Sequence, residues 1–172
     1  GYMELNTINK TGTWSETEII YGPGKGKTAM ALGKGLSAVA NGKTAVLIQF
    51  LQGSLDEEQM AVYTRLEPEL QIFRFEKSAE SFAKLSEEAK SREFMNIQNG
   101  LNFAKKVMAT GECDILILDG VLGLVDQNIV PLEEIQKLLS AREETMSLVL
   151  TGTVLPEELK EEADTIVRLE NV

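Results

Sequence analysis

A glycine-rich segment ending in Gly26-Lys27-Thr28 contains the residue types best suited to chemistry. The usual phosphate-binding loop reads G-x-x-x-x-G-K-[ST], and its glycines let several backbone N–H groups point into one concavity. Lys27 would place a mobile positive charge beside phosphate oxygens, and the Thr28 hydroxyl would be a ligand for Mg²⁺. We therefore predict a nucleoside triphosphate site formed by Gly22, Pro23, Gly24, Lys25, Gly26, Lys27 and Thr28.

The loop departs from the usual pattern at its start, where Tyr21 stands in place of the first glycine. Gly22 and Gly24 supply the flexibility instead, and Pro23 stiffens the loop and removes one possible N–H donor. The alternative is a glycine-rich turn that binds nothing. An apolar run before the loop and a helical pattern after it favour phosphate binding, because a helix N-terminus attracts anions.

Asp119 directly follows the apolar residues Ile115–Leu118. An acidic residue at the end of a buried strand is the expected second half of such a site, where it would hold Mg²⁺ directly or through water. The alternative role is the cap of a helix or turn. The next residue is Gly120, so no adjacent carboxylate is present to orient water, and rapid hydrolysis of the triphosphate is not expected.

Composition excludes several other classes of chemistry. The chain has 172 residues, one cysteine and no histidine, so an intramolecular disulfide, a zinc site of the usual kind and serine–histidine catalysis are excluded. For Cys113 we expect a buried side chain rather than a nucleophile. The net charge of −10 argues against a nucleic-acid partner. Residues 1–15 are polar, and no apolar run approaches the length that would span a membrane. We therefore expect a cytoplasmic protein without a signal peptide or membrane contact.

Short apolar runs alternate with helical patterns along the chain, which predicts a three-layer α/β/α fold with a mostly parallel sheet of about six strands. Ligands of such sheets bind beyond the carboxyl ends of the strands, where the loop and Asp119 lie. Residues 1–14 would form an N-terminal arm, 15–172 a single nucleotide-binding domain, and Gln52–Leu66 an irregular lid or substrate loop. The predicted strands are Thr17–Tyr21, Thr44–Phe50, Leu70–Phe75, Asp114–Asp119, Ser147–Thr151 and Asp164–Leu169, and the predicted helices are Ala29–Ala40, Ser86–Thr110, Pro131–Ala141 and Pro156–Ala163.

The loop Tyr21–Thr28 resembles the variant phosphate loop G-[DN]-G-K-G-K-[ST] of the corrinoid adenosyltransferases of the BtuR/CobO/CobP type. That family also lacks the first glycine. Further segments are similar to its motifs Q-F-x-K-G, D-x-V-V-L-D-E, A-R-P, L-T-G-R and P-x-x-L…A-D, in the same order. These segments are Gln49–Gly53, Asp114–Asp119, Pro131–Arg142, Leu150–Gly152 and Pro156–Asp164. The resemblance covers nearly the whole chain.

The resemblance implies a homodimeric P-loop fold of the RecA-like type and transfer of the 5′-deoxyadenosyl group of ATP to the Co(I) of a reduced corrinoid. It implies MgATP as cofactor, the corrinoid as acceptor substrate and a reductase as the source of Co(I). Lys27, Thr28 and Asp119 would be the catalytic residues, with Thr28 and Asp119 holding Mg²⁺. Phe75 and Phe82 lie where the family places aromatic residues near the corrin ring, although a role in the core is equally expected for them.

Departures from the family pattern leave alternatives open. Gly120 replaces a glutamate, Thr153 an arginine, Gln52 a lysine and Pro23 an Asp or Asn, and the sequence ends at Val172 before the family's basic tail. Such losses would weaken the stabilisation of charge in the transition state. The alternative to an adenosyltransferase is therefore a weakly active or inactive relative that binds ATP or a corrinoid. A different phosphoryl-transfer enzyme is a third possibility, against which the full-length resemblance counts.

Overall fold

Six parallel strands form a single sheet in the computed structural model, which describes residues 15–51, 55–75 and 81–172. The spatial order of the strands is β3-β2-β4-β5-β1-β6, so β5 separates the strand that precedes the loop from the strand that ends in Asp119. All five pairings are parallel. The strands are β1 (Thr17–Tyr21), β2 (Ala45–Gln49), β3 (Leu70–Arg74), β4 (Ile115–Asp119), β5 (Ser147–Thr151) and β6 (Thr165–Arg168).

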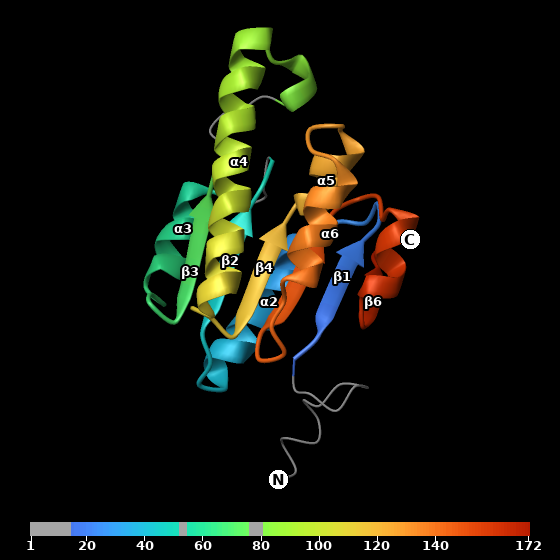
Figure 1. Cartoon of the computed structure of the whole chain (residues 1–172). Helices are drawn as coiled ribbons and strands as arrows, with labels where there is room; N and C mark the ends of the chain where they lie inside the picture. The colour runs from blue at the N-terminus through green and yellow to red at the C-terminus, as the bar shows by residue number, and fades with distance from the viewer. Residues whose placement is uncertain (1–14, 52–54, 76–80) are drawn as a thin grey trace.

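Helices cover both faces of the sheet, which confirms the predicted three-layer α/β/α architecture (Figure 1). One face carries α2 (Lys27–Ala40) and α3 (Glu57–Thr64). The other face carries α4, α5 and α6, whose bounds are Glu87–Thr110, Val121–Asp126 and Leu132–Ser140. Two short 3₁₀ helices, η1 (Phe82–Lys84) and η2 (Glu157–Glu162), complete the described elements.

The core has two layers because the strands are buried on both faces. Every residue of β2 and β4 is buried, which is typical of the central strands of a parallel sheet. Ile48 and Leu118 pack toward α4 and α5, whereas Leu47 and Ile117 pack toward α2. Successive residues of a strand point to opposite faces, so each of these strands contributes to both layers.

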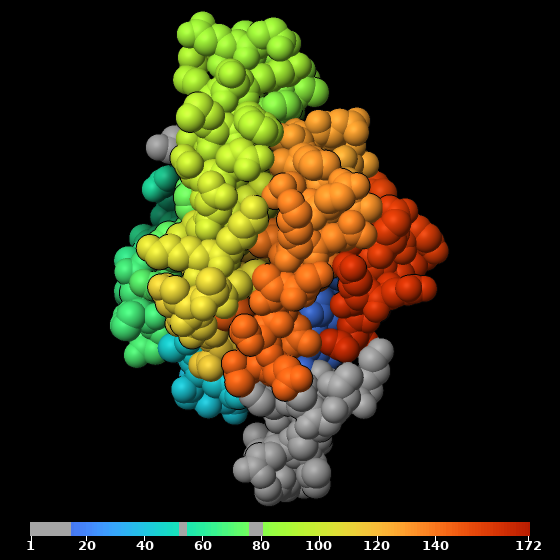
Figure 2. Space-filling view, viewed as in Figure 1, coloured from blue at the N-terminus to red at the C-terminus, as the bar shows by residue number. Residues whose placement is uncertain are grey.

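Helix α4 is the longest helix and extends past the carboxyl edge of the sheet (Figure 1). The Ser86 side chain accepts a hydrogen bond from the Ala89 N–H at 3.2 Å and so caps the helix. Figure 2 shows α4 beside α6 on the surface, where the Lys105 ammonium lies 3.1 Å from the Glu134 carboxylate. The amino-terminal half of α4 therefore stands above the edge at which the predicted site lies.

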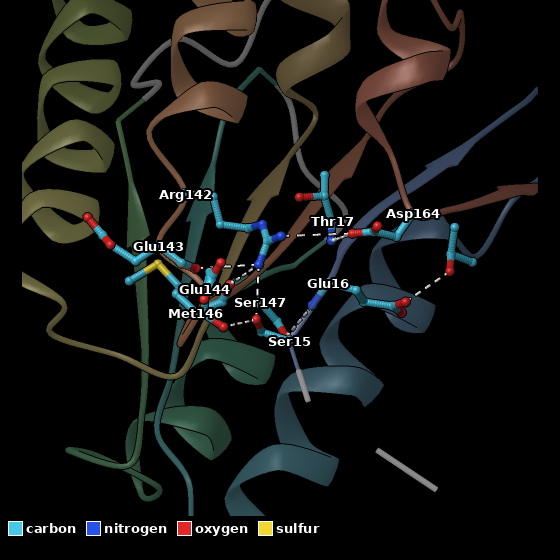
Figure 3. Close-up of polar contacts among 10 residues, drawn as sticks. Ser15, Glu16, Thr17, Arg142, Glu143, Glu144, Met146, Ser147 and Asp164 are labelled. Atoms are coloured by element: carbon cyan, nitrogen blue, oxygen red, sulfur yellow. Dashed lines mark hydrogen bonds and ion pairs between the residues drawn. The ribbon is translucent and has the colours of Figure 1, made fainter. Parts of the chain in front are cut away.

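A polar network joins the strand starts at the opposite edge of the sheet (Figure 3). The Arg142 guanidinium donates to the Ser15 hydroxyl and the Met146 carbonyl, both at 3.0 Å, and lies 3.9 Å from the Asp164 carboxylate. Asp164 also accepts from the Thr17 N–H at 2.8 Å. The network fixes the starts of β1 and β6 and the turn before β5, so the strand that carries the loop is anchored at its far end.

Three elements of the structure differ from the expectations drawn from the sequence. Part of the segment expected to be irregular is helix α3, which begins with a capping box between Asp56 and Gln59. Pro156–Ala163 forms the 3₁₀ helix η2 instead of an α-helix. Helix α5 was not predicted, since it is a single apolar turn and a half without a polar cap. The predicted arm at residues 1–14 and Gln52 lie outside the described residues. Within the described part of the chain, every helix is too short or too polar to cross a membrane.

Candidate nucleotide-binding site

The phosphate loop connects β1 to α2 at the carboxyl edge of the sheet. Gly26 has a φ angle of 104°, a conformation that L side chains rarely adopt, and it is followed by the first residue of α2, Lys27. The N–H groups of the first turn of a helix have no partner within the helix, and the helix dipole gives this end a partial positive charge. The start of α2 therefore presents backbone donors suited to a phosphate group.

The first half of the loop is held by the residues that follow β6. The Gly24 N–H donates to the Leu169 carbonyl at 2.9 Å, and the Lys25 N–H donates to the Asn171 side-chain oxygen at 2.6 Å. A Cβ atom on Gly24 would lie 2.7 Å from the Leu169 backbone, and one on Gly22 would lie 2.4 Å from it. These N–H groups are used within the fold, so the donors at the start of α2 are the ones placed to meet a ligand.

Lys27 lies over the same loop. Its ammonium donates to the carbonyl oxygens of Gly22 at 2.8 Å and Gly24 at 2.7 Å. The positive charge is thus held beside the concavity of the loop by neutral acceptors, without a carboxylate partner at these contacts. A phosphate oxygen would be a stronger acceptor for this ammonium than either carbonyl, because it carries a negative charge that attracts the ammonium.

Asp119 is the centre of a buried cluster of polar side chains. It is 3% exposed, and its carboxylate oxygens lie 2.9 and 3.1 Å from the Thr28 hydroxyl. The Thr151 hydroxyl donates to the same carboxylate at 2.7 Å, and the Gln49 amide donates at 3.2 Å. The Gly120 N–H in turn donates to the Thr151 hydroxyl at 2.8 Å. The structure therefore brings together Thr28 and Asp119, the two residues predicted to hold Mg²⁺.

Two members of this cluster were not predicted as site residues. Gln49 and Thr151 entered the sequence analysis only as parts of the family resemblance. Both end strands that neighbour β4, and Gln49 is in register with Asp119. A polar residue at the carboxyl end of an apolar strand was the available signal, because ligands of parallel sheets bind at that edge.

The oxygen ligands of this cluster fit Mg²⁺. The carboxylate of Asp119 and the hydroxyl of Thr28 are hard oxygen donors of the kind that Mg²⁺ prefers. Among the described residues, no group of three or more His, Cys, Asp or Glu side chains is placed to bind a metal ion. Mg²⁺ usually keeps several waters and binds substrate phosphates, so two protein ligands suffice.

A pocket of about 340 Å³ opens beside the cluster. Its lining includes Lys27, Thr28 and Asp119, together with the aromatic residue Phe82. Phe75 does not line this pocket. Its ring lies 5.8 Å from that of Phe103, and a Cβ on Gly100 would lie 3.0 Å from it, so it packs against α4. The structure thus brings one of the two candidate corrinoid residues, Phe82, to the phosphate site.

Two of the departures from the family pattern line the same pocket. Gly120 has a φ angle of 80°, and a Cβ atom there would lie 2.5 Å from the Phe50 carbonyl oxygen. The backbone at this position is therefore shaped for glycine, and a glutamate would need it to move. Thr153 differs, because it is exposed and its backbone carbonyl accepts the Gly22 N–H at 3.0 Å. Its side chain takes no part in that contact, so a larger residue would fit.

Cys113 lies near the start of β4, at the opposite end of the strand from Asp119. The thiol is 6% exposed, and burial together with the nearby Asp114 carboxylate raises its pKa to about 12. It stays protonated at neutral pH, and a protonated thiol is a poor nucleophile. This agrees with the expected structural role.

The loop, the cluster around Asp119 and the parallel sheet define a three-layer α/β/α protein with a P-loop fold. A KaiC-like protein from Pyrococcus horikoshii shares the fold, with a TM-score of 0.61 at 17% identity over 97% of this chain and 79% of that one. The ATP:corrinoid adenosyltransferase BtuR/CobO/CobP family matches residues 15–172, and the chain belongs to this family.

Relatives from two enteric bacteria are similar to the chain over most of its length. A corrinoid adenosyltransferase of Escherichia coli K12 is 27% identical over 154 residues, which cover 90% of this chain and 76% of the relative. The corrinoid adenosyltransferase CobA of Salmonella typhimurium is 28% identical over 155 residues, with the same coverage of both chains.

Proposed function

We propose that this protein is an ATP:corrinoid adenosyltransferase. Membership of the family supports the reaction class, and the contact between Thr28 and Asp119 beside the loop is the observation that carries the assignment. In the reaction, the electron pair of Co(I) attacks C5′ of ATP and forms a cobalt–carbon bond. The bond between C5′ and its oxygen breaks, and its electron pair leaves on triphosphate.

This chemistry suits a site without histidine. The nucleophile belongs to the corrinoid substrate, so the protein needs no general base of its own. Its tasks are to align the reacting atoms and to stabilise negative charge on the departing triphosphate. The N–H groups at the start of α2 and the ammonium of Lys27 are placed for the second task.

Thr28 and Asp119 would hold Mg²⁺, which supplies further positive charge to the triphosphate when bound. Thr151 and Gln49 keep the Asp119 carboxylate in one orientation, because each donates a hydrogen bond to it. The pocket beside them would take the acceptor, with the Phe82 ring against the face of the macrocycle. Phe75 would act indirectly, through the packing of α4.

An anaerobic assay tests this proposal. The protein is mixed with MgATP and chemically reduced cob(I)alamin, and the visible absorbance is followed while triphosphate is measured separately. We expect adenosylcobalamin and triphosphate in equal amounts, at a rate proportional to protein concentration. Tight ATP binding without either product would contradict the proposal.

That second outcome would favour a weakly active or inactive relative that binds ATP or a corrinoid. Gly120 is the observation that supports this alternative, because its backbone leaves no space for the glutamate of the family motif. A titration with an oxidised corrinoid, followed by its visible spectrum, would then decide between nucleotide binding and corrinoid binding. A homodimer, a reductase partner and a cytoplasmic location remain expectations taken from the sequence.

A further inference from the structure

Arg74 ends β3 at the carboxyl edge of the sheet, and two nitrogen atoms of its guanidinium are buried without a partner. Its Nε and Nη2 atoms are buried, and neither has a hydrogen-bond partner in the structure. Arginine is always charged in proteins and presents a planar set of donors. Buried polar groups are almost always hydrogen-bonded, and leaving a charged donor unpaired costs free energy. The two atoms therefore indicate a missing acceptor.

The position of Arg74 relates it to the site. Arg74 is in register with Gln49 on β2, and Gln49 is in register with Asp119 on β4. Residues two apart in a strand share a face, so Arg74 lies on the same face as Leu70 and Ile72, which belong to the layer under α2 and α3. Gln49 lies on this face too, and its amide reaches Asp119. Arg74, Gln49 and Asp119 thus form a polar row across three neighbouring strands.

The distance across the sheet argues against the triphosphate as the missing acceptor. The loop follows β1, and three strands lie between β1 and β3. Neighbouring strands are about 4.8 Å apart, so the ends of β1 and β3 are separated by about 19 Å. A triphosphate that is bound to the loop and reaches Asp119 at the end of β4 would still lie two strands, about 10 Å, from the end of β3. A corrin macrocycle carries side chains around its whole rim and is broad enough to extend along this edge.

We propose that Arg74 binds an oxyanion at the rim of the acceptor corrinoid, as a specificity-determining residue. Two oxyanions could accept hydrogen bonds from this guanidinium: a peripheral carboxylate of a corrinoid precursor, or the phosphodiester of a finished cobalamin. Both present two oxygens to the two unpaired donors of the guanidinium. The inference rests on the proposed function, because it assumes that a corrinoid binds at this edge.

Binding of oxidised corrinoids tests the inference without relying on turnover. The visible spectrum is titrated with three compounds: cobyrinic acid a,c-diamide, which carries carboxylates; cobalamin, which carries a phosphodiester; and cobinamide, which carries neither. Arg74→Met removes the charge and keeps most of the side-chain volume, and Arg74→Lys keeps the charge without the planar pair of donors. Arg65→Met, at the exposed end of α3, is the control with the same change in net charge.

For Arg74→Met we expect the affinity for the compound with the matching oxyanion to fall about tenfold or more, with cobinamide and MgATP unaffected. The affinity of Arg74→Lys should lie between those of Arg74→Met and the wild type, and the affinity of Arg65→Met should equal that of the wild type. A loss confined to cobyrinic acid a,c-diamide identifies a carboxylate, and a loss confined to cobalamin identifies the phosphodiester. Equal affinities of wild type and Arg74→Met for all three corrinoids would overturn the inference.

Two further results separate this inference from the proposed function. If the wild type binds none of the three corrinoids, both the proposed function and the inference fail. If the wild type binds them but Arg74→Met lowers only the melting temperature, Arg74 has a partner within the protein and the inference alone fails. We expect the melting temperature of Arg74→Met to equal or exceed that of the wild type, because the variant removes an unpaired buried charge.

Discussion

The hydroxyl of Thr28 and the carboxylate of Asp119 lie 2.9 Å apart, although 91 residues separate them in the chain. Thr28 belongs to the first turn of α2, and Asp119 is the last residue of β4. The two meet because α2 packs across the sheet from β1 to β4, bringing its first turn over the end of that strand. This contact joins the two halves of the proposed Mg²⁺–triphosphate site.

The ammonium of Lys27 supplies a first prediction. Lys27→Ala should weaken MgATP binding about 10- to 100-fold, because one charge-assisted hydrogen bond to a phosphate is lost. Calorimetric titration with MgATP measures the change. Lys106→Ala, on the exposed face of α4, is the control for a loss of one positive charge. Equal affinities of the two variants would sink the assignment of the phosphate loop.

Thr151 is expected to position the Asp119 carboxylate. Thr151→Val keeps the shape but removes the hydroxyl that donates to Asp119 and accepts the Gly120 N–H. We expect the free energy of unfolding to fall by about 1–3 kcal/mol, because two buried groups lose a partner. We also expect the affinity for MgATP to fall. Thr151→Ser retains the hydroxyl and should restore both quantities in denaturant melts and calorimetry; a serine variant as weak as the valine variant would argue against the hydroxyl.

Gly120 provides a test of the backbone. Gly120→Ala should destabilise the protein by more than Gly111→Ala does. Both glycines have positive φ angles, 80° and 62°, but only at Gly120 would the new Cβ atom meet a neighbour, the Phe50 carbonyl oxygen at 2.5 Å. The shared strain is about 1–2 kcal/mol, and the difference between the two variants isolates the contact. Urea melts give both values, and equal losses would show that the loop around Phe50 yields without cost.

At Thr153, the structure has space for the arginine of the family pattern. The residue is exposed and lines the pocket, so Thr153→Arg should leave stability within about 0.5 kcal/mol of the wild type. A guanidinium there would stabilise the leaving triphosphate, and kcat should rise. Thr153→Gln is the control, since it adds length without charge. An unchanged kcat in the anaerobic assay would mean that the arginine is not what this chain lacks.

Glu18 and Glu134 should affect the pH dependence of stability in opposite directions. Burial raises the pKa of Glu18 above 4.5 despite its contact with Lys34, so the folded state binds this proton more tightly than the unfolded state. Its contribution to stability therefore grows as the pH falls from neutral toward 4.5. A hydrogen bond from Lys105 lowers the pKa of Glu134, whose contribution is complete above 4.5 and is lost below it.

Glutamine variants at these two positions make that difference measurable. The stability of Glu18→Gln relative to the wild type should be highest at neutral pH and should decrease as the pH approaches 4.5. The stability of Glu134→Gln relative to the wild type should be lowest at neutral pH and should reach the wild-type value in acid. Thermal melts between about pH 3 and about pH 7 follow both, because this range extends below the ordinary carboxyl pKa. Parallel curves for the two variants would contradict the assigned burial of Glu18.

The sequence predicts the strands well because their signal is local. Continuous apolar runs indicate strands buried on both faces, and β1 and β5 lie at the predicted bounds, Thr17–Tyr21 and Ser147–Thr151. Helix α3 has no fully buried residue, so apolar periodicity does not indicate it. Its capping box was the remaining signal. Helix α5 is capped by Gly120 through backbone geometry, which leaves no polar residue in the sequence to mark its start.

The same distinction holds for the site. The phosphate loop is predictable because its function resides in consecutive residues. The roles of Gln49 and Thr151 depend on which strands flank β4 and on their register, and this information is absent from either segment alone. A role for Arg74 is still harder to predict from the sequence, because the evidence for it is a pair of donors without acceptors in the folded chain.

The packing of Leu169 against the loop changes how variation among related sequences should be interpreted. Gly22 and Gly24 have no space for a side chain, because the Leu169 backbone lies against them. Gly26 has open space beside it, and its positive φ angle is what requires glycine there. Substitutions at the first two positions would thus be expected to coevolve with the chain after β6. Substitutions at Gly26 would instead be expected in relatives that no longer bind a nucleotide. One short motif therefore carries two independent evolutionary records.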